Sequence, residues 1–219
     1  MPRLLFEKKG ESIWISHLDL MRVFQRAFKR ARLPLTHTQG FNPRPSVSIA
    51  LPLSVGVTSN CELLDFALDG CDVSLSEIRS RLNDALVAGI RVLDVYEQGR
   101  KIRDLSLLLC SVVLEYDSGY PADGVERLNT LFGKEEVVVA KKTKNGIQDQ
   151  NIIPMIRSMN VVAQGENCIE LNALICCQNP TLNPNQLVAA IERYEPEMTP
   201  DFSSCCRLEI YDGAEVIFR

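Results

Sequence analysis

Apolar residues recur at two different spacings along the chain, and these spacings predict helices alternating with strands. In the segment "HLDLMRVFQRAFKRARL", the apolar residues follow the i, i+3, i+4 and i+7 positions of one helix face. Ser16 and Asp19 form a capping box before it, and Pro34 lies where the pattern ends. This segment therefore predicts a capped amphipathic helix.

Strand-like runs surround this helix in the first part of the chain. "RLLFEKKG" and "SIWI" predict a hairpin or a bent strand with glycine at the turn. "SVSIALPLSVGVTS", "CELLDFALDG" and "IRVLDVYEQ" predict further strands, with a capped helix over "SLSEIRSRLNDAL" before the last of them. The order β-α-β-β-α-β over residues 1–99 predicts a ferredoxin-like domain.

The polar segment "GRKIRD" predicts a boundary, and residues 104–219 repeat the same order of elements. "LSLLLCSVVLEYD", "CIELNALICC" and "CRLEIYDG" predict strands, and "DGVERLNTLF" and "NPNQLVAAIERY" predict helices. "EEVVVAKKTKNGIQDQNIIPMI" predicts an inserted hairpin that turns at Asn145-Gly146. The predicted fold class is α+β: tandem ferredoxin-like halves, each an antiparallel sheet with helices on one face.

Charge divides the chain unevenly. The net charge is -4, yet residues 1–60 carry nine Lys and Arg against three acids, which leaves -10 for the remainder. Such asymmetry indicates an anionic partner for the first quarter of the chain. No apolar run approaches the length of a membrane-spanning helix, and "MPRLLFEKKG" lacks the apolar region of a signal peptide, so we expect a cytoplasmic protein without a membrane partner.

The sequence contains few of the residue patterns that form enzyme active sites. The eight cysteines form no C-x-x-C pair, so we expect reduced thiols, no metal site and no cofactor. No Ser-His-Asp, H-E-x-x-H or phosphate-loop pattern occurs. His17 and His37 are the two histidines, and they are the candidates for a general base if the protein is an enzyme.

Four cations recur at helical spacing in the first predicted helix: Arg22, Arg26, Lys29 and Arg30. Side chains at this spacing reach successive phosphates of a nucleic acid backbone, whereas an ordinary solvated helix face mixes charges of both signs. The loop "QGFNPRP" that follows carries Gln39, Phe41, Asn42 and Arg44 between residues that favour extended or left-handed backbone. A rigid structural turn is the alternative reading of this loop. The short connection predicts that the basic helix face and the loop lie close together.

A second group of cations, Lys141, Lys142 and Lys144, precedes the predicted turn of the inserted hairpin. It indicates a basic hairpin tip that supports nucleic-acid binding, although lysine-rich tips also serve solubility.

The stretches "ISHLDLMRVFQRAFKRARLP" and "QGFNPRPSVSIALPLSVGVTS" resemble the opening of the bacterial radical SAM-linked protein family, a domain of unknown function, and "KKTKNG" is similar to a later family feature. The resemblance implies an accessory protein whose partner is a radical SAM protein and whose substrate is RNA or a ribosomal component. Relatives are expected to show histidine and lysine where this chain has Arg44 and Ser46, which weakens a histidine-dependent reaction in the loop.

Three functions remain open from the sequence. The preferred one is a non-catalytic protein that binds RNA or another polyanion and presents it to the radical SAM enzyme. The second is a stand-alone RNA-processing enzyme that uses His17 or His37. The third is an adaptor whose basic face docks on the radical SAM partner without nucleic acid.

Overall fold

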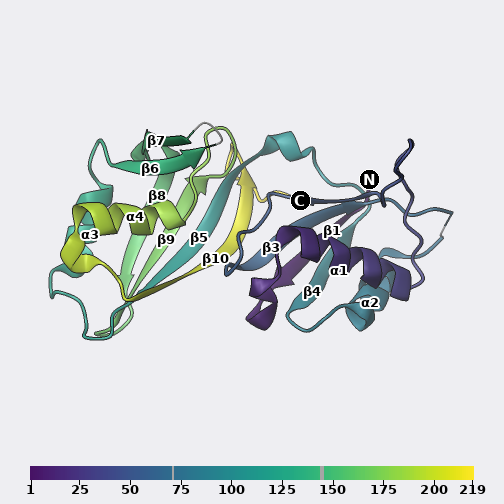
Figure 1. The fold of residues 1–219 in the computed structure, drawn as a ribbon, viewed down its shortest axis with the longest axis horizontal. Helices are drawn as coiled ribbons and strands as arrows, with labels where there is room; N and C mark the ends of the chain where they lie inside the picture. The colour runs from purple at the N-terminus through teal and green to yellow at the C-terminus, as the bar shows by residue number, and fades with distance from the viewer. Residues whose placement is uncertain (71, 144–145) are drawn as a thin grey trace. The chain divides into compact units, whose positions relative to one another are not determined.

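The computed structural model describes residues 1–70, 72–143 and 146–219 (Figure 1). Contacts divide the chain into two compact units, one of Met1–Asp104 with Ile217–Arg219 and one of Leu105–Val216. Cys71, Lys144 and Asn145 lie outside the described residues. The turn predicted at Asn145 and the charge predicted at Lys144 therefore stay predictions.

The first unit is an antiparallel sheet with two helices. The strands stand side by side in the order β4-β1-β3-β2, and every neighbouring pair is antiparallel. The elements follow the chain as β1 (Arg3–Lys8), η1 (Gly10–Trp14), α1 (His17–Arg30), β2 (Val47–Ala50), β3 (Thr58–Phe66), α2 (Leu75–Ala85), β4 (Ile90–Tyr96) and η2 (Ile102–Asp104).

Both helices of this unit cover the same face of its sheet (Figure 1). Phe24 and Phe28 of α1 point into the core, where the ring of Phe24 lies 4.7 Å from that of Phe6, and the ring of Phe28 lies 5.2 Å from that of Phe66. Leu82 of α2 is fully buried in the same core. This packing fixes α1 on the sheet and leaves its opposite face in solvent.

The second unit is also an antiparallel sheet with two helices. Its strand order is β10-β5-β9-β8, and β6 and β7 form a separate two-stranded sheet. Its elements are β5 (Leu105–Glu115), α3 (Gly124–Phe132), β6 (Val138–Thr143), β7 (Gly146–Asn151), η3 (Ile153–Met155), β8 (Ile156–Ala163), β9 (Cys168–Cys176), α4 (Asn185–Tyr194), η4 (Pro196–Met198) and β10 (Phe202–Asp212). The hydroxyl of Tyr194 bonds the backbone of Val138, which ties α4 to the small sheet.

The predicted α+β class is confirmed, with three local differences. "SIWI" is not a strand, because the Ser12 hydroxyl donates to the carbonyls of Lys9 and Gly89 and the Lys8 ammonium donates to those of Ile13 and Ile15. These bonds close the 3-10 helix η1 in place of a hairpin. Residues 51–57 interrupt the predicted strand after β2, and β8 was not predicted.

No helix in the described ranges is long and apolar enough to cross a membrane.

Candidate nucleic-acid interface

Helix α1 begins at a reciprocal cap. The Asp19 amide donates to Ser16 Oγ at 3.2 Å, and Ser16 Oγ donates to Asp19 Oδ2 at 2.8 Å. The four predicted cations of this helix, Arg22, Arg26, Lys29 and Arg30, are all exposed. The helix therefore presents its basic face to solvent, as its spacing predicts.

The predicted recognition loop is held at its base by hydrogen bonds between residues 36–38 and residues 44–46. The Thr38 amide donates to the Arg44 carbonyl at 2.9 Å, the Arg44 amide donates to Thr38 Oγ1 at 3.0 Å, and the Ser46 amide donates to the Thr36 carbonyl at 2.8 Å. Gly40 adopts a φ of 132°, which a residue with a Cβ rarely adopts. The loop is thus a short hairpin-like turn whose two ends are joined by hydrogen bonds.

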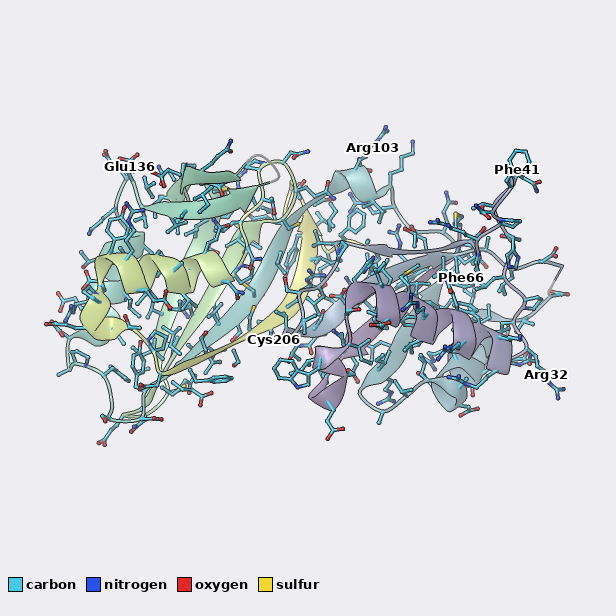
Figure 2. All side chains as sticks on the ribbon, viewed as in Figure 1. Arg32, Phe41, Phe66, Arg103, Glu136 and Cys206 are labelled. Atoms are coloured by element: carbon cyan, nitrogen blue, oxygen red, sulfur yellow. The ribbon has the colours of Figure 1, made fainter. Side chains whose placement is uncertain are left out.

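The tip of this loop extends into solvent. Phe41 is 107% exposed, and its ring points away from the rest of the unit (Figure 2). Gln39 and Asn42 are exposed beside it. All three side chains are accessible to a ligand.

Between α1 and β2 lies a cleft of about 830 Å³, here named the α1–β2 cleft. Helix α1 contributes His17, Leu18, Met21, Arg22 and Gln25. The base of the loop and β2 contribute Thr38, Arg44, Pro45, Ser46, Val47 and Ser48, and Met1 completes the lining. The cleft therefore brings together two cations predicted from separate segments, Arg22 and Arg44.

An acidic neighbour partly balances Arg22. Its Nη1 lies 2.8 Å from Asp19 Oδ1, in an ion pair between exposed side chains. The hydrogen bond from Ser16, and then that from Arg22, lower the pKa of the Asp19 carboxyl. Asp19 does not line the cleft, so the described lining residues include two arginines, neutral polar side chains and apolar side chains but no carboxylate.

The two histidines differ in their positions. His17 lines the cleft, and its Nδ1 is buried with no hydrogen-bond partner among the described residues. His37 is exposed in the base of the loop, where it forms an isolated bridge with Pro45, and it does not line the cleft.

The remaining cations of α1 lie outside the cleft lining. Arg30 donates to the carbonyl of Ala85 at the end of α2, with Nη2 at 2.6 Å and Nε at 3.2 Å. This contact gives Arg30 a structural role in joining the two helices. Arg26 and Lys29 are exposed further along α1.

The predicted basic hairpin tip belongs to the second unit. Lys141 Nζ donates to the carbonyl of Thr181 at 2.9 Å. Lys142 belongs to β6, but its side chain and the whole of Lys144 lie outside what the structure describes.

Four neutral polar residues of the cleft were not predicted from the sequence: Gln25, Thr38, Ser46 and Ser48. Gln25 follows Leu18 and Arg22 at helical spacing, and Ser46 and Ser48 alternate along an extended segment. These spacings were available as signals, but only the packing of β2 beside α1 places the residues on one surface.

The arrangement suits an anion better than a metal ion. In the described parts of the chain, no group of three or more His, Cys, Asp or Glu side chains could hold a metal. Guanidinium groups pair with phosphate oxygens through two parallel hydrogen bonds, while hydroxyls and amides bond to sugars and base edges.

Comparisons with known proteins give a family but no activity. A family model described as "Uncharacterized protein conserved in bacteria (DUF2344)" matches residues 2–184. Among curated proteins none matches this sequence. A solved structure titled "Crystal Structure of an Unknown Protein from Galdieria sulphuraria" is similar over 96% of each chain, with 11% identity and a TM-score of 0.26.

Proposed function

We propose that this chain, which belongs to the DUF2344 family of uncharacterized bacterial proteins, binds RNA or another polyanion in the α1–β2 cleft. The protein then presents this substrate to a radical SAM enzyme in the cytoplasm and is not itself the catalyst. The observation that carries the proposal is that Arg22 and Arg44 line one cleft, and that no carboxylate is among the lining residues which the structure describes. Two guanidinium groups in one cleft favour a ligand with more than one phosphate.

Neutral groups supply the second part of the recognition. Gln25, Thr38 and Ser46 lie in the same cleft and offer hydrogen bonds to sugars and base edges. Beyond it, Gln39, Phe41 and Asn42 are exposed at the tip of the loop, where they can read the shape or the bases of an unpaired region.

The length of α1 supports a polymer as the ligand. The helix has 14 residues, so it is about 21 Å long at 1.5 Å per residue. Arg26 and Lys29 extend the positive charge of Arg22 along it, and both are exposed. A polyanion that leaves the cleft therefore meets further cations, whereas a small phosphate ester does not.

The radical SAM partner rests on the sequence resemblance carried by "ISHLDLMRVFQRAFKRARLP" and the loop after it. The tandem ferredoxin-like architecture also belongs to this proposal. It is supported by the strand orders β4-β1-β3-β2 and β10-β5-β9-β8. In the first unit α1 precedes β2 and α2 follows β3, and in the second unit α3 precedes β8 and α4 follows β9.

The test reverses the two cleft charges. We expect the double variant Arg22→Glu, Arg44→Glu to bind a fluorescein-labelled mixed-sequence RNA at least tenfold more weakly in an anisotropy titration. The dependence of log affinity on log salt should fall by about two, because two phosphate contacts are lost.

The matched control is the double variant Arg91→Glu, Arg103→Glu, which makes the same charge change at two exposed arginines of the first unit outside the cleft. It should bind almost as the wild type does. Equal affinity of the cleft variant and the wild type would contradict the proposal. Binding of the radical SAM enzyme without any RNA would assign the basic face to protein docking.

One observation favours a second candidate function, an RNA-processing enzyme. His17 lines the cleft beside the region where the phosphates are proposed to bind, and its buried Nδ1 has no hydrogen-bond partner within the described parts of the chain. If His17 is a general base, RNA is cleaved or transferred without a partner protein, and His17→Ala abolishes that turnover while RNA binding persists.

A further inference from the structure

Trp14 is an exposed aromatic residue that does not line the α1–β2 cleft. It is the one tryptophan of the sequence, and its side chain is 69% exposed at the end of η1. Most tryptophan side chains bury far more of their surface, because the indole is large and apolar.

The indole lies over Gly56. A Cβ added at Gly56 would be 3.4 Å from Cζ3 of Trp14, an ordinary van der Waals distance, so the ring is close to this part of the backbone. Gly56 has a φ of 84°, and its amide donates to the carbonyl of Ile13 at 2.9 Å. The ring therefore has Gly56 on one side while most of its surface faces solvent.

The chain connects Trp14 directly to the α1–β2 cleft. Leu18, in the first turn of α1 after Trp14, lines the cleft. Strand β2 begins at Val47 in the cleft lining, and residues 51–55 connect its end to Gly56. The loop that carries Phe41 precedes β2, so the two exposed rings, Phe41 and Trp14, follow opposite ends of this strand.

We propose that the ligand of the cleft is single-stranded RNA and that Trp14 stacks one of its unpaired bases. This inference rests on the proposed function, since it assumes that Arg22 and Arg44 hold the phosphates. Trp14 lies three residues before His17, and Phe41 lies three residues before Arg44, both of which line the cleft. Exposed rings near a cationic groove favour single strands, because every base has a face that stacks on an aromatic ring. A duplex keeps its bases stacked inside the helix, where a side chain on a protein surface does not reach them.

The single tryptophan makes the test direct. We expect a single-stranded oligouridine of roughly ten to fifteen nucleotides to quench Trp14 fluorescence during titration. An RNA hairpin with a fully paired stem and a minimal loop should bind more weakly and quench less.

Affinity measurements on variants complete the test. Trp14→Ala should bind the oligouridine about tenfold more weakly, and Trp14→Phe should restore most of the affinity. The matched control is Phe202→Ala, which removes a ring that is 61% exposed in the second unit and should leave affinity unchanged. Circular dichroism of each variant confirms that the fold is retained.

The outcomes separate this inference from the proposed function. Oligouridine that binds through Arg22 and Arg44 but leaves fluorescence and the Trp14→Ala affinity unchanged would overturn the stacking role alone. Equal affinity for the hairpin and the single strand would overturn the assignment to single-stranded RNA. If neither RNA binds the wild type, the proposed function fails and this inference fails with it.

Discussion

The ion pair between Arg22 and Asp19 reduces the positive charge that Arg22 presents to a ligand. Asp19 lies 2.8 Å from it, and the hydrogen bonds from Ser16 and Arg22 lower the pKa of this carboxyl. The carboxylate therefore stays ionised at neutral pH and offsets part of the positive charge that Arg22 brings to the cleft. The same residue takes part in the cap of α1 through its hydrogen bonds with Ser16. Asp19 therefore stabilises the helix start and lowers the positive charge of the cleft.

At this scale we predict that Asp19→Asn strengthens RNA binding about two- to fivefold at low salt. The substitution removes a negative charge next to Arg22 and keeps a side chain of similar size. The gain should disappear as salt rises, because screening removes the effect of exposed charges. Anisotropy titrations of labelled RNA at several salt concentrations measure this change.

The control for this prediction is Asp104→Asn. Asp104 Oδ1 lies 3.7 Å from Nε of the exposed Arg103. The substitution therefore alters an exposed ion pair that does not line the cleft. Its RNA affinity should match that of the wild type. An Asp19→Asn variant that binds no better than Asp104→Asn would show that Asp19 does not attenuate the site.

Helix α1 ends in a left-handed backbone conformation that the residue at that position, Arg32, rarely adopts. The Leu33 amide donates to the Phe28 carbonyl at 3.0 Å, and the Arg32 amide donates to the Lys29 carbonyl at 3.2 Å. Arg32 has a φ of 55°, the left-handed conformation that this type of helix end requires. Glycine is the usual residue there because a Cβ is strained in that conformation. Figure 2 shows Arg32 at this end of the helix.

We therefore predict that Arg32→Gly raises the free energy of unfolding by up to about 1 kcal/mol, which corresponds to a rise in Tm of about 2–4 °C. Arg26→Gly, in the middle of the same helix, should lower it by about 1 kcal/mol, because glycine is unfavourable inside a helix. Thermal and urea denaturation followed by circular dichroism compare the two variants. A loss of stability in both would mean that Arg32 contributes more than its backbone strain costs.

At the scale of the whole molecule, the end of the chain returns to the unit in which the chain begins. The sequence predicts residues 104–219 as one domain, but Ile217–Arg219 belong to the first unit. Phe218 is fully buried there, with its ring 5.5 Å from the guanidinium carbon of Arg3 and 5.1 Å from that of Arg100. The Arg100 amide donates to the Arg219 carbonyl at 2.9 Å. Folding of the first unit therefore depends on the last residues of the chain.

Phe218→Ala should destabilise the first unit by about 3–5 kcal/mol, the usual cost of removing a buried phenylalanine ring. Amide hydrogen exchange measured by mass spectrometry should show faster exchange in β1, β3 and β4 than in the strands of the second unit. Phe202→Ala, which removes an exposed ring, serves as the comparison and should change exchange little. Unchanged protection in β1 of the Phe218 variant would contradict the dependence on the tail.

Local rules explain which predictions the structure confirms. The cap at Ser16 fixes the start of α1, and the cap at Ser74 fixes that of α2, because each hydroxyl accepts from the third amide after it. Where a distant residue competes, the local pattern fails. The Ser12 hydroxyl donates to the carbonyl of Gly89, which is 77 residues away in the sequence. This contact helps to stabilise a 3-10 helix where "SIWI" predicts a strand.

The order of residues along the chain was enough to predict the α+β class, the basic face of α1 and a polar loop at Gln39–Arg44. These features depend on the order of residues within one element, where periodicity and caps act over a few positions. Packing between distant segments places Arg44 in one cleft with Arg22 and His17, Trp14 over Gly56, and Phe218 in the first unit. Each of these contacts joins segments that the local pattern does not pair, because it is set by how strands and helices pack once the core is buried.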